Sequence, residues 1–316
     1  MAESAWWWVA FNAGVLGLLA LDLGVFHRKA YAPSLREAGL WSAVWIALAL
    51  GFNAWIWLAV GAEPGAQFLT GYLVEKSLSV DNIFVFALIF STFGVPAAYQ
   101  HRVLFWGIVG ALVMRGILIA AGAYLIETFH WIVYVFGALL VATGVRLAAR
   151  QEHAQDLNRT LLVRLIRRVI PVTSDFHGSN FWARVQGRLL ATPLLVVLLV
   201  VEASDLLFAV DSIPAIFAIT SDPFLVYTSN VFAILGLRAL YFLLAGVIDK
   251  FRYLKVALAA ILVFVGGKML LSEVVHVAPA VSLGAIAAIL AFGMALSLRR
   301  PAGSAGRETA MADDRS

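Results

Sequence analysis

The chain has 316 residues, of which 62% are hydrophobic and only 13% charged. A soluble protein of this length could not bury so much apolar surface, so most of the chain is expected to lie in a lipid bilayer. The net charge of +4 does not indicate nucleic acid binding, because the basic residues lie in loops between apolar runs. The sequence contains no cysteine, which excludes disulfides, thiolate metal sites, iron–sulfur clusters and thiol redox chemistry.

Nine apolar runs are long enough to cross a bilayer as helices. Membrane strands are not expected, because no ten-residue stretch alternates between apolar and polar residues. The first run begins at Trp6 and is preceded by Glu3 as the only charged side chain, which favours a retained span over a cleaved signal peptide. In chain order, the predicted spans are 6–26, 40–61, 66–93, 103–123, 129–149, 191–219, 225–247, 254–272 and 279–298.

The loops between these runs differ in charge. Nearly all lysines and arginines outside the spans follow spans 1, 3, 5 and 7 or lie in the C-terminal tail, whereas the intervening loops carry acids instead. Because cytoplasmic loops are enriched in Lys and Arg, this pattern predicts an external N-terminus and a cytoplasmic C-terminus. The amphipathic stretch 161–170 of the basic loop 150–190 is expected to lie on the anionic inner leaflet, although a solvated linker would explain most of its charge. The tail 301–316 is expected to be disordered.

Two acidic segments interrupt the apolar runs. Glu75–Asn82 lies within 66–93, and Asp205–Ser212 lies within 191–219. Both consist of an acid, five residues, a second acid and a small polar residue. Charged groups at bilayer depth cost several kcal/mol each, so we expect these segments to carry the function.

Within each segment, the spacing of six residues would place the two acids about 120° apart on a regular helix. A break between them would let both acids face one site. Ser77, Ser79 and Pro214 favour such a distortion of the two helices.

The similarity of the two regions continues in the following spans. Arg115 and Arg238 each lie in the next span, and Arg146 and Lys268 each lie two residues after a glycine in the span after that. Spans 3–5 and 6–8 are therefore predicted to form two inverted copies of a three-helix unit, an arrangement typical of secondary transporters with interrupted helices. The predicted fold is all-α and polytopic, with the segments 1–65 (spans 1 and 2), 66–149 (repeat unit 1), 150–190 (basic loop), 191–272 (repeat unit 2), 273–300 (span 9) and 301–316 (tail).

The polar groups within the spans predict a site for a transported divalent cation, with no tightly bound cofactor. Carboxylate, amide and hydroxyl oxygens suit Mn²⁺, Mg²⁺ or Ca²⁺. The six histidines fall in or beside loops, which disfavours a buried zinc or copper site. The candidate ligands are Glu75, Asp81, Asn82, Glu202, Asp205, Asp211 and Ser212.

Basic residues within the spans are expected to balance these acids. The arginines would hold the carboxylates ionised when the site is empty, or exchange partners during transport. Lys76 would face inner water, and Lys268 would extend outward. Asp22 and Ser79 are further candidates for the pathway, although Asp22 could equally cap a helix or reach the interface. The counter-charges or gating residues are Arg115, Arg238, Lys76 and Lys268.

The alternative is that these acids and bases only hold the helices together. Polar contacts between membrane helices contribute modestly to stability, so such a role needs no special sequence pattern. It does not account for the repetition of one acidic segment in opposite orientation, or for the excess of acids over bases.

The motifs resemble the TerC family of bacterial integral membrane proteins, and the start of the chain resembles its Alx branch. The resemblance extends over about residues 10–298. It implies membership of the LysE-like transporter superfamily, manganese efflux and a role in tellurite resistance. Some relatives are linked to metal delivery or membrane-protein assembly. The segments that carry it are Leu21–Arg28, Glu75–Phe86, Arg102–Gly107, Phe208–Phe217 and Ser229–Phe242.

The hypothesis from the sequence is a non-enzymatic Mn²⁺ exporter of the bacterial inner membrane, with Asp81 and Asp211 as central ligands. Outward movement of a divalent cation against 100 mV costs about 4.6 kcal/mol. Proton antiport through the same carboxylates could supply this energy, because the sequence lacks a nucleotide-binding P-loop. The expected partners are the cation and the bilayer, without nucleic acid. The alternatives are an assembly or metalation factor for other proteins, a tellurium-resistance protein without metal flux, and, less favoured, a membrane enzyme.

Overall fold

A computed structural model describes residues 5–21, 33–129, 131–149, 161–244, 254–274 and 277–299. The predicted pathway residue Asp22 and the predicted disordered tail 301–316 lie outside these residues. The described elements are α1 (Ala5–Leu21), α2 (Leu35–Ala59), α3 (Ala62–Thr92), α4 (Ala97–Thr128), α5 (Ile132–Ala149), α6 (Leu161–Val169), β1 (Trp182–Val185), β2 (Arg188–Ala191), α7 (Pro193–Phe217), α8 (Pro223–Leu235), α9 (Leu237–Leu244), α10 (Leu254–Leu270) and α11 (Pro279–Arg299).

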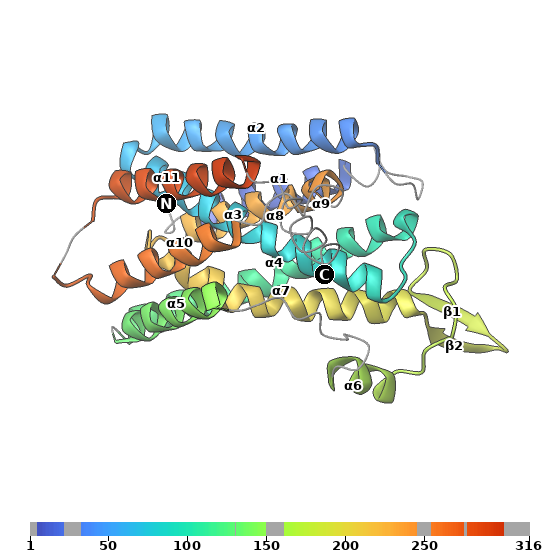
Figure 1. Cartoon of the computed structure of the whole chain (residues 1–316). Coiled ribbons are helices and arrows are strands. Elements are labelled where there is room, and N and C mark those ends of the chain that lie inside the picture. The colour runs from blue at the N-terminus through green and yellow to red at the C-terminus, as the bar shows by residue number, and fades with distance from the viewer. Residues whose placement is uncertain are drawn as a thin grey trace, which may run out of the picture.

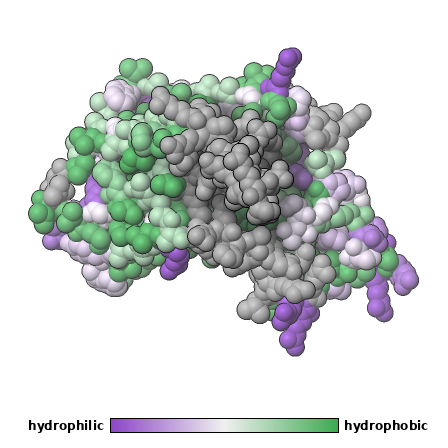
Figure 2. All heavy atoms as spheres, viewed as in Figure 1, coloured by the Kyte–Doolittle hydropathy of each residue, from purple (hydrophilic) through white to green (hydrophobic). Residues whose placement is uncertain are grey.

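The long helices form a bundle in which the axes of α2, α5, α7 and α11 are roughly parallel, although the chain runs in opposite directions along some of them (Figure 1). The visible face of this bundle is largely apolar, and the hydrophilic residues lie mainly at its margins (Figure 2). Large apolar side chains are exposed along the helices, including Leu58 at 88%, Ile117 at 65% and Phe292 at 67%. An apolar exterior of this kind is stable in contact with lipid, so the chain is a multi-pass integral membrane protein with an all-α membrane region.

The described residues include five helices that are long and apolar enough to cross a membrane, or six if α8 and α9 form one bent span. Helices α1 and α10 are apolar but shorter. Helix α3 is long enough, but it carries Glu75, Lys76 and Asp81 and is not among these apolar helices. The all-α polytopic class is therefore confirmed, and the number of nine spans stays a prediction.

The expected breaks in the two acidic helices are wrong. Helices α3 and α7 continue through their acidic segments. The hydroxyls of Ser77 and Ser79 donate to the carbonyls of Leu73 and Glu75, one turn earlier, at 2.5 and 2.8 Å, and leave the helix intact. Pro214 lies in the last turn of α7, where the lost hydrogen bond has little helix left to disrupt.

The pronounced bend lies elsewhere, at Gly236 between α8 and α9, which meet at 41°. The sequence prediction treated this region as a single continuous span, 225–247. The bend leaves carbonyls at the end of α8 without their usual donors in the helix, so a donor from another helix is needed. The structure therefore places the irregular backbone in the arginine-bearing span and not in the acidic ones.

Helices α5 and α10 pack very closely through glycines. A side chain at Gly266 would place its Cβ 2.7 Å from the carbonyl oxygen of Gly137, and one at Gly144 would lie 2.8 Å from the carbonyl oxygen of Ala259. Residue numbers rise along α5 as they fall along α10, so the two helices are antiparallel. Small residues allow this close approach of two backbones in a membrane.

The basic loop contains a β-hairpin that the sequence analysis did not predict. Strands β1 and β2 are antiparallel and joined by Gln186 and Gly187, whose φ angles are 51° and 78°. A two-residue turn with two positive φ angles fits the twist of a hairpin, and glycine adopts this geometry without strain. Each strand has only four residues, which is too short for a clear alternating pattern.

Candidate functional site

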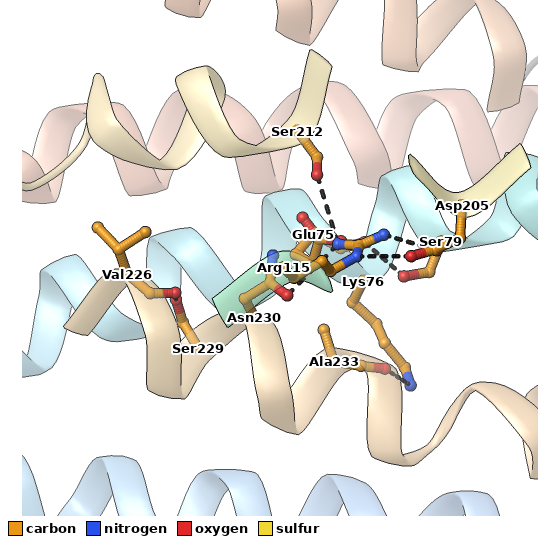
Figure 3. Close-up of polar contacts among 10 residues, drawn as sticks. All are labelled: Glu75, Lys76, Ser79, Arg115, Asp205, Ser212, Val226, Ser229, Asn230 and Ala233. Atoms are coloured by element: carbon orange, nitrogen blue, oxygen red, sulfur yellow. Dashed lines mark hydrogen bonds and ion pairs between the residues drawn. The ribbon is translucent and has the colours of Figure 1, made fainter. Parts of the chain in front are cut away.

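Arg115 lies at the centre of a buried polar network. It belongs to α4, is 2% exposed, and extends between α3 and α7 (Figure 3). Its Nε and Nη2 donate to the two carboxylate oxygens of Asp205 at 3.0 and 2.9 Å, and its Nη1 donates to Glu75 Oε1. The planar guanidinium thus binds one acid through two parallel hydrogen bonds and a second acid at its other end. One arginine connects the two acidic segments that the sequence analysis identified.

Neutral polar groups complete the surroundings of this guanidinium. Ser212 Oγ and Asn230 Oδ1, from α7 and α8, each accept from Arg115 Nη1 at 3.4 Å. Two buried atoms of the network, Glu75 Oε2 and Asn230 Nδ2, have no hydrogen-bond partner in the described part of the chain. Buried polar atoms are normally satisfied, so these two leave capacity for a further ligand.

The continuous helices explain which members of the acidic segments meet. Glu75 and Asn82 are seven residues apart, and so are Asp205 and Ser212, which places each pair on one helical face. Asn82 is 2% exposed, and its buried Oδ1 also has no partner among the described residues. The first acid and the final polar residue of each segment therefore form a polar stripe on α3 and a second one on α7.

Asp211 lies on another face of α7. It accepts a hydrogen bond from the hydroxyl of Thr143, on α5, at 3.0 Å. Its separation of six residues from Asp205 accounts for this direction, because α7 is unbroken between them. Asp81 belongs to α3, and its side chain lies outside the described part of the structure. The residues that converge on Arg115 are thus Glu75 and Asp205, whereas the sequence analysis assigned the central position to Asp81 and Asp211.

Glu202 lies against the backbone of α4. A Cβ atom at Gly110 would lie 2.0 Å from Glu202 Oε1, so a larger residue there would displace this carboxylate. Its Oε2 is buried and has no hydrogen-bond partner among the described residues. Glu202 is one turn before Asp205 on α7, which places a further carboxylate beside the central network.

The two lysines bind within the bundle. Lys76 Nζ donates to the carbonyl of Ala233 at 3.2 Å, at the bend between α8 and α9, instead of facing inner water. Lys268 Nζ donates to Ser282 Oγ of α11 at 3.1 Å instead of extending outward. A cation at the C-terminal end of α8 also fits the negative end of that helix dipole. Lys76 is therefore placed to stabilise the bend.

Arg238 is buried at 5% exposure and lines a small pocket together with Asp205. The other walls include Gly107 and Ala111 of α4 and Val201 of α7. These wall residues precede Arg115 and Asp205 along their helices. The pocket therefore lies on the side of the ion pair where α4 and α7 begin and where the β-hairpin is attached.

No three His, Cys, Asp or Glu side chains in the described part of the chain are grouped as a metal site. Where the two acidic helices meet, the positive charge is the guanidinium of Arg115. The predicted set of metal ligands accordingly stays a prediction. Its described members lie in three places: around Arg115, beside Thr143, where Asp211 lies, and against Gly110, where Glu202 lies.

Three residues of the site were not predicted: Gly110, Thr143 and Asn230. Asn230 carries a recognisable signal, because it is an amide in an otherwise apolar run. Thr143 and Gly110 carry none, since threonine and glycine are ordinary residues of membrane helices. Their importance depends on which helix lies opposite.

A bundle of apolar helices with a buried network of charges at its centre defines a polytopic integral membrane protein. The model of the "Integral membrane protein TerC family" matches residues 60–303, which is most of the chain. The chain belongs to the TerC family, as the motifs indicated.

Similar proteins occur in diverse bacteria. The "Uncharacterized membrane protein STKORF319" of Myxococcus xanthus is 57% identical over 291 residues, covering 92% of this chain and 91% of that protein. The "Putative membrane-bound redox modulator Alx" of Escherichia coli (strain K12) is 50% identical over 292 residues, covering 90% and 91%. An "Uncharacterized membrane protein" of Rickettsia felis is 40% identical, covering 93% and 97%. No solved structure matches the chain.

Proposed function

We propose that the chain is a secondary transporter that exports Mn²⁺ from the cytoplasm across the bacterial inner membrane, in exchange for protons. The observation that carries the proposal is the buried bridge from Glu75 through Arg115 to Asp205. Two carboxylates from separate helices converge on one replaceable positive charge. A divalent cation between the same acids would neutralise both of them.

The chemistry of the site suits a hard divalent cation. Carboxylate oxygens of Glu75 and Asp205, the amide oxygen of Asn82 and the hydroxyl of Ser212 are ligands typical of Mn²⁺. When the cation enters, Arg115 would release at least one acid. Asn230 Oδ1, already 3.4 Å from Nη1, offers an acceptor to the displaced guanidinium.

The proposed membrane arrangement has nine spans, an external N-terminus and an inverted repeat of α3–α5 and α7–α10. Matching helix contacts support the repeat: α3 packs against α8 as α7 packs against α4, and α5 packs against α10. Helix α5 also packs against α7 as α10 does against α3. Inverted repeats that meet around a polar centre are characteristic of alternating access. The pocket beside Arg238 then lies on the cytoplasmic side of the ion pair and would admit the cation.

Export against the membrane potential requires coupling to another gradient. Glu202 and Asp211 are carboxylates with no ion pair within 4 Å in the described part of the chain. A carboxylate in a bilayer without a bound cation readily takes up a proton. These two acids are therefore our candidates for proton carriers, separate from the acids held by Arg115.

The experiment is flux of Mn²⁺ into proteoliposomes that contain the purified protein, with cytosolic manganese in producing cells as the second measurement. Asp81→Asn, Asp205→Asn and Asp211→Asn should each reduce flux strongly, whereas Asp175→Asn, at an exposed loop position, should not. Unchanged flux in all three membrane variants, or no flux in the wild type, would refute the proposal.

The alternative function is an assembly or metalation factor, for which copurifying proteins and absent flux would be the evidence. The Escherichia coli relative is named as a redox modulator. A redox role for the present chain would have to proceed without thiols of its own, because it has no cysteine. A contribution to tellurium resistance is a further proposal, tested by growth on tellurite with and without the protein.

A further inference from the structure

Helix α6 has three distinct faces. Val163 is 2% exposed and packs in a core cluster with residues of α7, whereas Leu165 and Val169, one turn apart, are 60% and 72% exposed. Arg164 and Arg168 are exposed and lie beside this apolar strip. A helix that exposes adjacent apolar and basic strips is suited to the boundary between headgroups and acyl chains.

The β-hairpin repeats this combination on one face. Arg184 pairs with Leu189 across the strands, and Trp182 lies two residues before Arg184, so all three side chains share a face. Trp182 is 50% exposed and Leu189 is 64% exposed. Tryptophan and arginine beside an aliphatic side chain are typical of the membrane interface.

The hairpin and α6 are held at the end of the bundle. Strand β2 ends at Ala191 and α7 begins at Pro193, so the hairpin lies where α7 leaves the apolar region (Figure 1). Thr192 fixes the hairpin by donating from its backbone nitrogen to the Phe181 carbonyl at 2.9 Å. Ala191 also donates to the carbonyl of Pro171 at 3.0 Å, which ties the segment after α6 to the same place. Both amphipathic faces are therefore held next to the first turn of α7.

We infer that α6 and the β1–β2 hairpin form a binding surface for anionic phospholipid. Leu165, Val169 and Leu189 enter the acyl boundary, and the arginines bind phosphate headgroups. The charge determines the occupant, because α6, β1 and β2 contain arginines and no acidic residue. Guanidinium groups bind phosphate oxygens in pairs, which favours an anionic headgroup over a neutral surface.

The absence of cysteine from the sequence allows a clean labelling experiment. Full-length Leu189→Cys and Val169→Cys variants are labelled with an environment-sensitive fluorophore and placed in nanodiscs of phosphatidylcholine, with or without phosphatidylglycerol. Quenching by acrylamide measures the exposure of the label to water. Glu127→Cys, at the far end of α4, controls for general effects of lipid composition.

Phosphatidylglycerol should protect the labels at 169 and 189 from acrylamide, with no change at 127. Replacement of Arg168 or Arg184 by glutamine should lower the ratio of bound to detached surface about fivefold for each arginine removed. Replacement by lysine should retain most of the protection, since the charge remains. Labels that stay exposed in both lipids, as a surface that docks a soluble protein would, overturn the inference. Equal protection in neutral and anionic nanodiscs overturns it as well.

Discussion

Substitution of Arg115 by methionine tests whether the central network is an ion bridge of the strength that the structure implies. The change keeps much of the side-chain volume and removes three hydrogen bonds to two buried acids. Loss of one partner from a buried ion pair costs about 3–5 kcal/mol, because the remaining charge stays desolvated. Ordinary interhelical hydrogen bonds in membranes average only about 0.6 kcal/mol. The loss of stability in Arg115→Met therefore distinguishes a buried ion bridge from ordinary interhelical hydrogen bonds.

The measurement is thermal unfolding of the purified protein in detergent, followed by tryptophan fluorescence. Arg115→Met should unfold at a clearly lower temperature than Arg115→Lys, which retains the charge but loses the paired geometry. Adding Glu75→Gln and Asp205→Asn to Arg115→Met should restore most of the lost stability, because no uncompensated charge then remains. If the triple variant is less stable than Arg115→Met alone, the network is not held by charge and the reasoning fails.

The same variants test the link between Arg115 and the transported cation. In Arg115→Met, Mn²⁺ should occupy the space between Glu75 and Asp205 and raise the unfolding temperature. A free concentration a hundredfold above Kd would stabilise the protein by about 2.7 kcal/mol. The triple variant lacks both carboxylates and should not respond. An equal response of the two variants would place the cation elsewhere.

Three further substitutions follow from close contacts. Gly110→Ala should displace the carboxylate of Glu202, lower the unfolding temperature only slightly, and reduce Mn²⁺ flux. Glu202→Ala in the same chain should remove the effect on stability, and failure to do so would contradict the contact. Gly266→Leu should separate α5 from α10, because its Cβ would lie 2.7 Å from the Gly137 carbonyl oxygen. It should lower the unfolding temperature more than the control Gly267→Leu, which faces open space. Lys76→Met should remove the donor to the end of α8, weaken the bend by about 1–2 kcal/mol, and speed amide exchange in α8 and α9; unchanged exchange there would refute a role in the bend.

The sequence predicted the charged centre because its residues are expensive in lipid. Glu75, Asp205 and Arg115 stand out from apolar runs, and the structure brings all three together. Helical periodicity also predicted the separate direction of Asp211, since six residues correspond to about 120°. The predicted break between the two acids of each segment would have removed this separation, and that part of the prediction is wrong. Serine hydroxyls bond back to their own helix, so they were a weak reason to expect one.

Other parts of the site depend on which helices become neighbours. Gly110 accommodates Glu202, which approaches from α7, and Thr143 matters because Asp211 faces α5. Neither contact is encoded within its own segment. The bend at Gly236 is similar, because the donor that stabilises it comes from Lys76, more than a hundred residues away along the chain. Tertiary contacts of this kind are not visible in local composition.

The separation of the acids into two groups bears on how transport could be coupled. Glu75 and Asp205 share Arg115, so their charges are compensated without a bound metal. Asp211 accepts a hydrogen bond from Thr143 and interacts at longer range with Arg146, and Glu202 packs against the backbone at Gly110, so neither forms an ion pair among the described residues. The buried site therefore contains two kinds of acid: those whose charge is balanced by Arg115, and those without an ion pair. One continuous helix, α7, therefore presents to α4 an acid that is paired with Arg115, with acids that lack an ion pair on either side of it. The proposed exchange of a cation for protons needs carboxylates with two separate roles, and α7 carries them one or two turns apart.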